Sequence, residues 1–149
     1  MKNIYAIMMF VAIFIGVENH VLYAQVEISD SLIEAIAFVE SGNNHVALGE
    51  DGELGIMQIS KAVLDEYNQF NPRLDYVDLL DPSKCKKVGR WYLERLRDHY
   101  GCKDLDTMLA AYNMGPRARF IKNWSSGVKA YVQKVKRELR LNQVSEMFR

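Results

Sequence analysis

The stretch Ala35-Ile36-Ala37-Phe38-Val39-Glu40-Ser41-Gly42 places one carboxylate at the end of an otherwise apolar run. Apolar residues fill most positions from 31 to 39, which predicts a helix that is buried on most of its faces. Ser29 or Asp30 can cap its start, and Gly42 is typical of the residue just beyond a helix C-terminus. Glu40 would then face the negative end of the helix dipole among apolar neighbours, and both effects raise the pKa of a carboxyl group. The pattern therefore predicts an acid that can donate a proton near neutral pH, unless Glu40 is only a surface residue at a fraying helix end.

The composition is that of one globular domain preceded by an export signal. The chain has 149 residues, of which 49% are hydrophobic and 26% charged, enough for one well-buried core. Lys2 is followed by an apolar stretch over 4–17, then by polar residues and the small residue Ala24. This layout is typical of a secretory signal, because a spanning helix needs about 20 apolar residues. We expect residues 1–24 to be a signal peptide and 25–149 an exported domain of the periplasm or cell envelope. Leu22 is bulky for a cleavage site, so an uncleaved N-terminal anchor stays open.

Charge is balanced overall and unevenly distributed. The formal net charge is zero, residues 27–81 carry many acids, and residues 117–149 are rich in Lys and Arg. The basic end is either a contact for an anionic polymer or membrane surface or a solvated helix face. The sequence contains no zinc-type ligand cluster, phosphate-binding glycine loop or aromatic-basic repeat. We therefore expect no metal, no cofactor and no nucleic-acid partner, membrane contact only through the N-terminal signal, and a monomer.

The periodicity after residue 24 predicts an all-α domain. Apolar residues recur at helical spacing and no segment alternates as a strand does. Serine, aspartate, proline and glycine mark the helix ends. After the first helix, the expected helices cover residues 61–67, 82–100, 104–114 and 127–139.

The two cysteines are not expected to bond to each other. Cys85 and Cys102 lie at opposite ends of the helix predicted for 82–100. A rise of ~1.5 Å per residue separates them by roughly 25 Å, whereas a disulfide needs Cα atoms within about 7 Å. Unpaired thiols or an intermolecular bond remain.

Two further stretches carry residues suited to binding a sugar. Residues 52–59 read Gly-Glu-Leu-Gly-Ile-Met-Gln-Ile, in which glycines let the backbone approach a ligand and Gln58 offers a donor and an acceptor. Residues 111–116 read Ala-Tyr-Asn-Met-Gly-Pro, which places a phenol and an amide at a helix end. Taken singly, the first stretch is an irregular loop, Tyr112 a core residue and Asn113 a helix cap.

Together with Glu40-Ser41-Gly42, these stretches resemble the soluble lytic transglycosylase family. Residues 52–59 are similar to its Gly-x-x-Gly-Leu-Met-Gln-Ile segment, and residues 111–116 to its Ala-Tyr-Asn-x-Gly-Pro segment. Tyr131-Val132 fits the last helix of the family. The resemblance covers residues 28–139 and implies a lysozyme-like fold with a cleft.

The resemblance also implies a chemistry and a set of site residues. Members cleave the β-1,4 bond between N-acetylmuramic acid and N-acetylglucosamine in peptidoglycan glycan strands and leave 1,6-anhydromuramyl ends. Glu40 would be the single catalytic residue, and Tyr112 could hydrogen-bond it and hold its orientation. The implied substrate-binding residues are Ser41, Gly55, Met57, Gln58, Tyr112 and Asn113. The short layout is similar to small members that work with secretion or conjugation machinery or in phage entry, which is an analogy only.

Two other functions are compatible with the same residues. A goose-type lysozyme-like hydrolase would use a second acid to position water, and Asp51 or Glu53 is available for that. A non-catalytic peptidoglycan-binding component of a secretion system would keep the fold without the chemistry. The mass of the product separates the two enzymes, because an anhydro product is one water lighter than a hydrolysis product.

Overall fold

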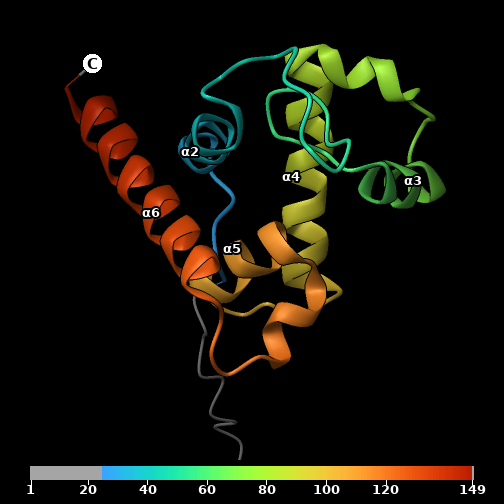
Figure 1. Ribbon diagram of the computed structural model, residues 1–149. Coiled ribbons are helices and arrows are strands. Elements are labelled where there is room, and N and C mark those ends of the chain that lie inside the picture. The colour runs from blue at the N-terminus through green and yellow to red at the C-terminus, as the bar shows by residue number, and fades with distance from the viewer. Residues whose placement is uncertain (1–24, 149) are drawn as a thin grey trace, which may run out of the picture.

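The computed structural model describes residues 25–148, and the expected signal segment lies outside them. Within this range the chain forms five α-helices and two 3-10 helices and no β-strand (Figure 1). The all-α class expected from the sequence is confirmed. The elements in chain order are α2 (Asp30–Ser41), α3 (Lys61–Phe70), η1 (Tyr76–Leu80), α4 (Pro82–Asp98), α5 (Leu105–Met114), η2 (Pro116–Phe120) and α6 (Ser126–Met147).

Local capping signals decide where the α-helices begin. At each start a side-chain oxygen accepts a hydrogen bond from a backbone N–H of the first turn, which stabilises a helix by about 1 kcal/mol. The capping residues are Ser29, Ser60, Asp81, Asp104 and Ser125. Pro82 occupies the first turn of α4, where its missing N–H leaves no hydrogen bond unmade.

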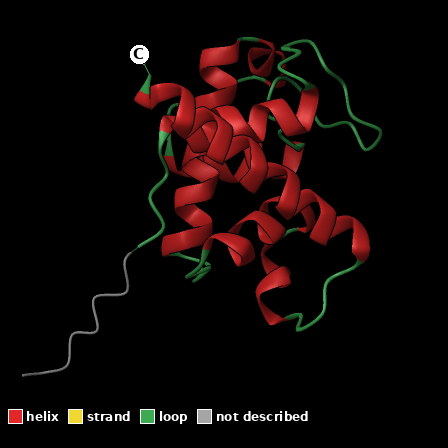
Figure 2. Cartoon of the chain, turned by 90° about the vertical axis from the view of Figure 1, so that its left-hand side faces the viewer, coloured by secondary structure: helices red, strands yellow, loops and turns green. Residues whose placement is uncertain are grey.

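The helix α2 is the centre of the packing. It lies between α6 and α4, and Figure 1 shows it nearly end-on between them. Most of its side chains are buried, as the apolar run predicts. The helices α2 and α6 cross, and the contacts pair their opposite ends: Glu40 near the end of α2 meets Tyr131 near the start of α6, and Ser31 meets Glu146. The view of Figure 2 shows the helices packed against one another, with the longer loops at the edge of the molecule. None of the described helices has the length and hydropathy that crossing a membrane requires.

The glycine-rich segment after α2 is a loop held in place by backbone bridges and by close packing against η1. Leu54 forms isolated bridges with Leu48 and Ile59, which fold residues 47–59 back on themselves. Gly55 has φ +80°, and a Cβ at this position would lie 2.1 Å from the carbonyl oxygen of Leu79. Only glycine therefore lets the loop lie against η1 at this point.

The structure corrects the predicted end of the last helix and agrees with the prediction for the cysteines. The last helix extends to Met147 rather than to 139, because Asn142 and Glu146 hydrogen-bond Ser31 of α2 and hold the extra turns in place. The cysteines agree with the prediction: Cys85, in the first turn of α4, and Cys102, beyond the end of that helix, are free, buried thiols.

Candidate active site

Glu40 lies in the last turn of α2, where the helix meets the glycine-rich loop. The helix ends at Gly42, which has the left-handed φ of 63° and donates its N–H to Ala37 and Phe38 carbonyls. This C-terminal capping turns the chain away and leaves the Glu40 side chain half-buried at the meeting point of α2, the loop and α6.

Tyr131 of α6 holds the Glu40 carboxylate. Its hydroxyl donates a hydrogen bond to Glu40 Oε1 at 2.6 Å, a short distance typical of a charge-assisted bond. The Tyr131 ring is buried against the core, so the hydroxyl has a fixed position. Tyr131 was expected in the last helix but was not predicted as a site residue. The available signal was one hydroxyl in an otherwise apolar stripe, since Val128, Val132 and Val135 are its neighbours on that face.

Burial raises the pKa of Glu40 from 4.5 to about 7. Loss of solvation is the largest cause, because the apolar end of α2 disfavours the ionised form. The hydrogen bond from Tyr131 opposes this effect, and repulsion from the Glu53 carboxylate adds to it. The carboxyl group can therefore exist in both protonation states near neutral pH, which is what a group acting first as an acid and then as a base requires.

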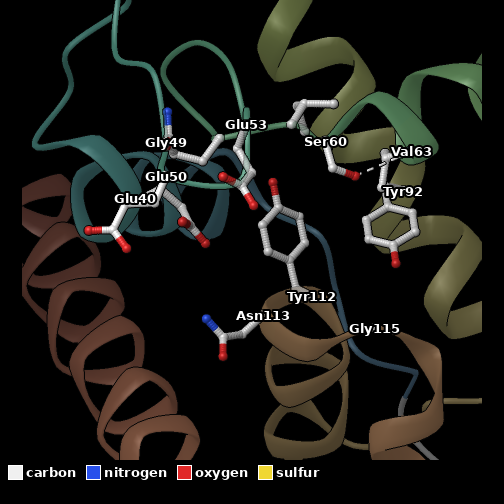
Figure 3. Close-up of a pocket in the computed structure, with 12 residues that line it drawn as sticks. Glu40, Gly49, Glu50, Glu53, Ser60, Val63, Tyr92, Tyr112, Asn113 and Gly115 are labelled. Carbon is white, nitrogen blue, oxygen red and sulfur yellow. Dashed lines mark hydrogen bonds between the residues drawn. The ribbon is translucent and has the colours of Figure 1, made fainter.

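A cavity of about 420 Å³ opens beside Glu40. It is bounded by the end of α2, the glycine-rich loop, the starts of α3 and the end of α5, with one residue from α4 (Figure 3). Its lining residues are Glu40, Gly49, Glu50, Glu53, Gln58, Ile59, Ser60, Val63, Tyr92, Tyr112, Asn113 and Gly115. Figure 3 shows the carboxylates of Glu50 and Glu53 on the loop side, across from Tyr112 and Asn113 on α5. Asp51, the other acid considered in the sequence, is exposed and does not line the cavity.

Tyr112 occupies the cavity wall but does not make the expected hydrogen bond to Glu40. Its hydroxyl donates to the carbonyl oxygen of Met57 at 3.0 Å, so it fastens α5 to the glycine-rich loop. The geometry differs from the expectation because the hydrogen bond to Glu40 comes from Tyr131 of α6, and no motif near Glu40 or Tyr112 in the sequence indicates that contact. Burial raises the pKa of Tyr112 well above its ordinary value, so the group stays a neutral donor.

Gln58 and Asn113 both line the cavity, but only the Gln58 side chain hydrogen-bonds to other described residues. The Gln58 amide nitrogen donates to the carbonyls of Ala47 and Gly55, at 3.2 and 3.0 Å, and its φ of 49° is left-handed. Its amide nitrogen is thus used within the loop, and its carbonyl oxygen lies beside Gly49, 2.7 Å from the place that a Cβ at that glycine would take. Asn113 is exposed, and its side chain makes no hydrogen bond to the residues that the structure describes.

Ser41, Gly55 and Met57 lie behind the cavity wall instead of lining it. Ser41 Oγ donates to the carbonyl of Ile56 at 2.8 Å, joining α2 to the loop. Met57 is fully buried, and Gly89 of α4 makes room for it, because a Cβ at Gly89 would lie 2.4 Å from the Met57 sulfur. These contacts are internal to the protein, and a substrate contact for these three residues stays a prediction.

Comparison with known proteins gives the same family and fold. The model of the family described as "Transglycosylase SLT domain" matches residues 22–135. Among solved structures, the chain is similar to the 70 kDa soluble lytic transglycosylase SLT70 from Escherichia coli, with a TM-score of 0.71 and 25% sequence identity. The match covers 80% of this chain and 22% of that protein, so the chain spans about a fifth of the length of this relative. The resemblance and the lysozyme-like helical fold expected from the sequence are confirmed.

Proposed function

The chain belongs to the transglycosylase SLT domain family, a family of glycosidic-bond-cleaving lyases, and on that premise we propose that it cleaves peptidoglycan with Glu40 as the single catalytic residue. The bond cleaved is the β-1,4 bond between N-acetylmuramic acid and N-acetylglucosamine, and the product is a 1,6-anhydromuramyl end. The observation that carries this proposal is a carboxyl group with a pKa of about 7, held by Tyr131 beside a cavity.

In the proposed reaction no water is consumed. Protonated Glu40 donates its proton to the glycosidic oxygen, the bond to the muramyl C1 breaks, and N-acetylglucosamine leaves with a free 4-hydroxyl. The muramyl acetamide carbonyl stabilises the positive charge that develops at C1. Ionised Glu40 then removes the proton of the C6 hydroxyl as its oxygen bonds to C1, which closes the anhydro ring and restores the acid.

The described contacts support separate roles for the side chains around Glu40. The Tyr131 hydroxyl stabilises the ionised form and keeps the carboxylate in one orientation between the two proton transfers. Tyr112 fixes the loop that carries Gln58, and Asn113 is free to hydrogen-bond a sugar amide or hydroxyl. Each of these roles is assigned to one side chain and can be tested on its own.

Hydrolysis is the second candidate, because Glu53 lines the same cavity and acts electrostatically on Glu40. A carboxylate across a sugar-sized space can activate water as a general base, while the other carboxyl group acts as the acid. In that case Glu53→Gln would abolish a product that is one water heavier. If transglycosylation is the reaction, Glu53→Gln keeps the anhydro product and lowers the upper pH limit of activity, since repulsion from Glu53 no longer raises the pKa of Glu40.

The experiment that tests the proposal is a digest of purified sacculi followed by mass spectrometry of the soluble products. The wild-type chain should release 1,6-anhydromuramyl products, and Glu40→Gln should release none. Products with reducing muramyl ends would instead support hydrolysis. No products from the wild-type chain would favour a binding role without catalysis.

A further inference from the structure

The face of α6 that points away from α2 changes character along its length. The inner face is buried against the core through Val128, Tyr131, Val132 and Val135. On the opposite side, side chains three or four residues apart share one face. Its middle turns carry Lys134, Arg137 and Arg140, and its last two turns carry Leu141, Val144, Met147 and Phe148.

The end of this outer face is an exposed apolar patch, formed by Leu141, Val144, Met147 and Phe148. Leu141 is 57% exposed and Phe148 86% exposed, although the same turns are ordered by contacts on their other side. There, Glu146 and Asn142 bind Ser31 of α2. Figure 1 shows this end of α6 at the margin of the molecule, beyond α2. A contiguous apolar patch on a fixed helix marks a site of interaction.

The charges beside the patch favour an anionic partner. The helix contains five basic and two acidic residues, and both acids are engaged, Glu138 with Arg137 and Glu146 with Ser31. Lys136 pairs with Asp106 of α5, and Lys129 donates to Asn123. Lys134 and Arg140 make no ion pair with any residue in the described range, so their charges are available to a partner.

We propose that the outer face of α6 docks the domain on an anionic lipid surface. An apolar patch that enters the acyl boundary, next to basic side chains at headgroup level, is the arrangement of an interfacial helix. Leu141, Val144 and Phe148 would enter the boundary, and Lys134 and Arg140 would contact lipid phosphates. The cavity is lined from α2, the loop, α3, α4 and α5, so docking through α6 leaves it open to a glycan strand. This inference does not depend on the proposed reaction.

The test is sedimentation of the full chain with phosphatidylglycerol–phosphatidylcholine vesicles and with phosphatidylcholine vesicles. Residues 1–24 contain an apolar stretch that can itself bind lipid, so the comparison is between variants of one chain. The wild-type chain should prefer the anionic vesicles and lose binding with added salt. Leu141→Ser with Phe148→Ser should lower the partition coefficient at least about tenfold. Lys134→Gln with Arg140→Gln should lower it about fivefold for each charge.

Val77→Ser with Phe120→Ser is the matched control, because it removes two equally exposed apolar side chains elsewhere. This control should bind vesicles as the wild type does, and every variant should keep its melting temperature, since all the changed side chains are exposed. Equal binding of the α6 variants and the wild type would overturn the proposal, as would wild-type binding with no preference for anionic lipid. A wild-type dimer that the Leu141 and Phe148 changes convert to a monomer, without lipid binding, would show that a second copy covers the patch.

Discussion

Removing the Tyr131 hydroxyl should show what its hydrogen bond does to the pKa and orientation of Glu40 while the burial of Glu40 stays the same. In Tyr131→Phe the ring still fills its buried position, but Glu40 Oε1 loses its donor at 2.6 Å. This hydrogen bond lowers the pKa of Glu40, against the larger opposing effect of burial. The variant should therefore have a more basic Glu40, and it should stay an active acid at higher pH than the wild type.

The size of the effect follows from the geometry. A hydrogen bond to a charged group contributes about 1.5–3 kcal/mol, and about 1.4 kcal/mol changes a pKa by one unit. The wild-type rate should fall as the pH rises through about 7, where Glu40 loses its proton. In Tyr131→Phe this alkaline limit should move upward by about one pH unit or more. The maximal kcat should fall roughly tenfold or more, because the carboxylate is no longer held in one orientation.

Steady-state kinetics on soluble glycan chains between pH 5 and pH 9 measure both effects, as kcat and KM at each pH. Tyr112→Phe is the matched control, since it removes a second tyrosine hydroxyl near the site, one whose hydrogen bond goes to the Met57 carbonyl and not to Glu40. It should lower the melting temperature and leave the alkaline limit unchanged. An alkaline limit in Tyr131→Phe that stays in place or moves downward would refute the role given to Tyr131.

Three other changes test separate parts of the structure. Glu40→Gln should lose at least ~10²-fold in activity. Because its pKa is raised, Glu40 contributes stability to the wild type that is full below pH 4.5 and is lost as the pH rises through about 7. This variant should therefore be as stable as the wild type below pH 4.5 and more stable than it at pH 8, by up to about 3 kcal/mol. Equal melting temperatures at pH 8 would contradict this. Gly55→Ala should lower the stability by at least ~2 kcal/mol in urea unfolding, because its Cβ meets the Leu79 carbonyl at a left-handed φ, and an unchanged midpoint would show that the loop can move away. Asn113→Ala should raise KM by an amount equivalent to about 1–3 kcal/mol with unchanged kcat and melting temperature, whereas a fall in stability alone would remove Asn113 from the site.

Much of the fold could be predicted because its signals are local. Ser60, Asp81 and Asp104 begin helices as capping residues do, and Gly42 ends α2 in the left-handed conformation that favours glycine. The apolar run before Glu40 also predicted a raised pKa, which the burial of that carboxyl group produces. These features depend on residues within one or two turns of each other.

What the sequence did not predict depends on contacts between distant segments. The partner of Glu40 is Tyr131 of α6, 91 residues along the chain, whereas the family resemblance had implied Tyr112 as that partner. The inner position of Met57 depends on the small size of Gly89, which no loop motif indicates. The extra turns of α6 similarly depend on Ser31 of α2. Sequence patterns therefore did not predict which side chains of different helices meet.

The most direct test of the central claim is the mass of the products released from sacculi by the wild-type chain and by Glu40→Gln. We expect muropeptides that are one water lighter than hydrolysis products, from the wild-type chain only. Products of the heavier mass, or the lighter products released at an unchanged rate by Glu40→Gln, would contradict the assignment of Glu40 as the single acid and base.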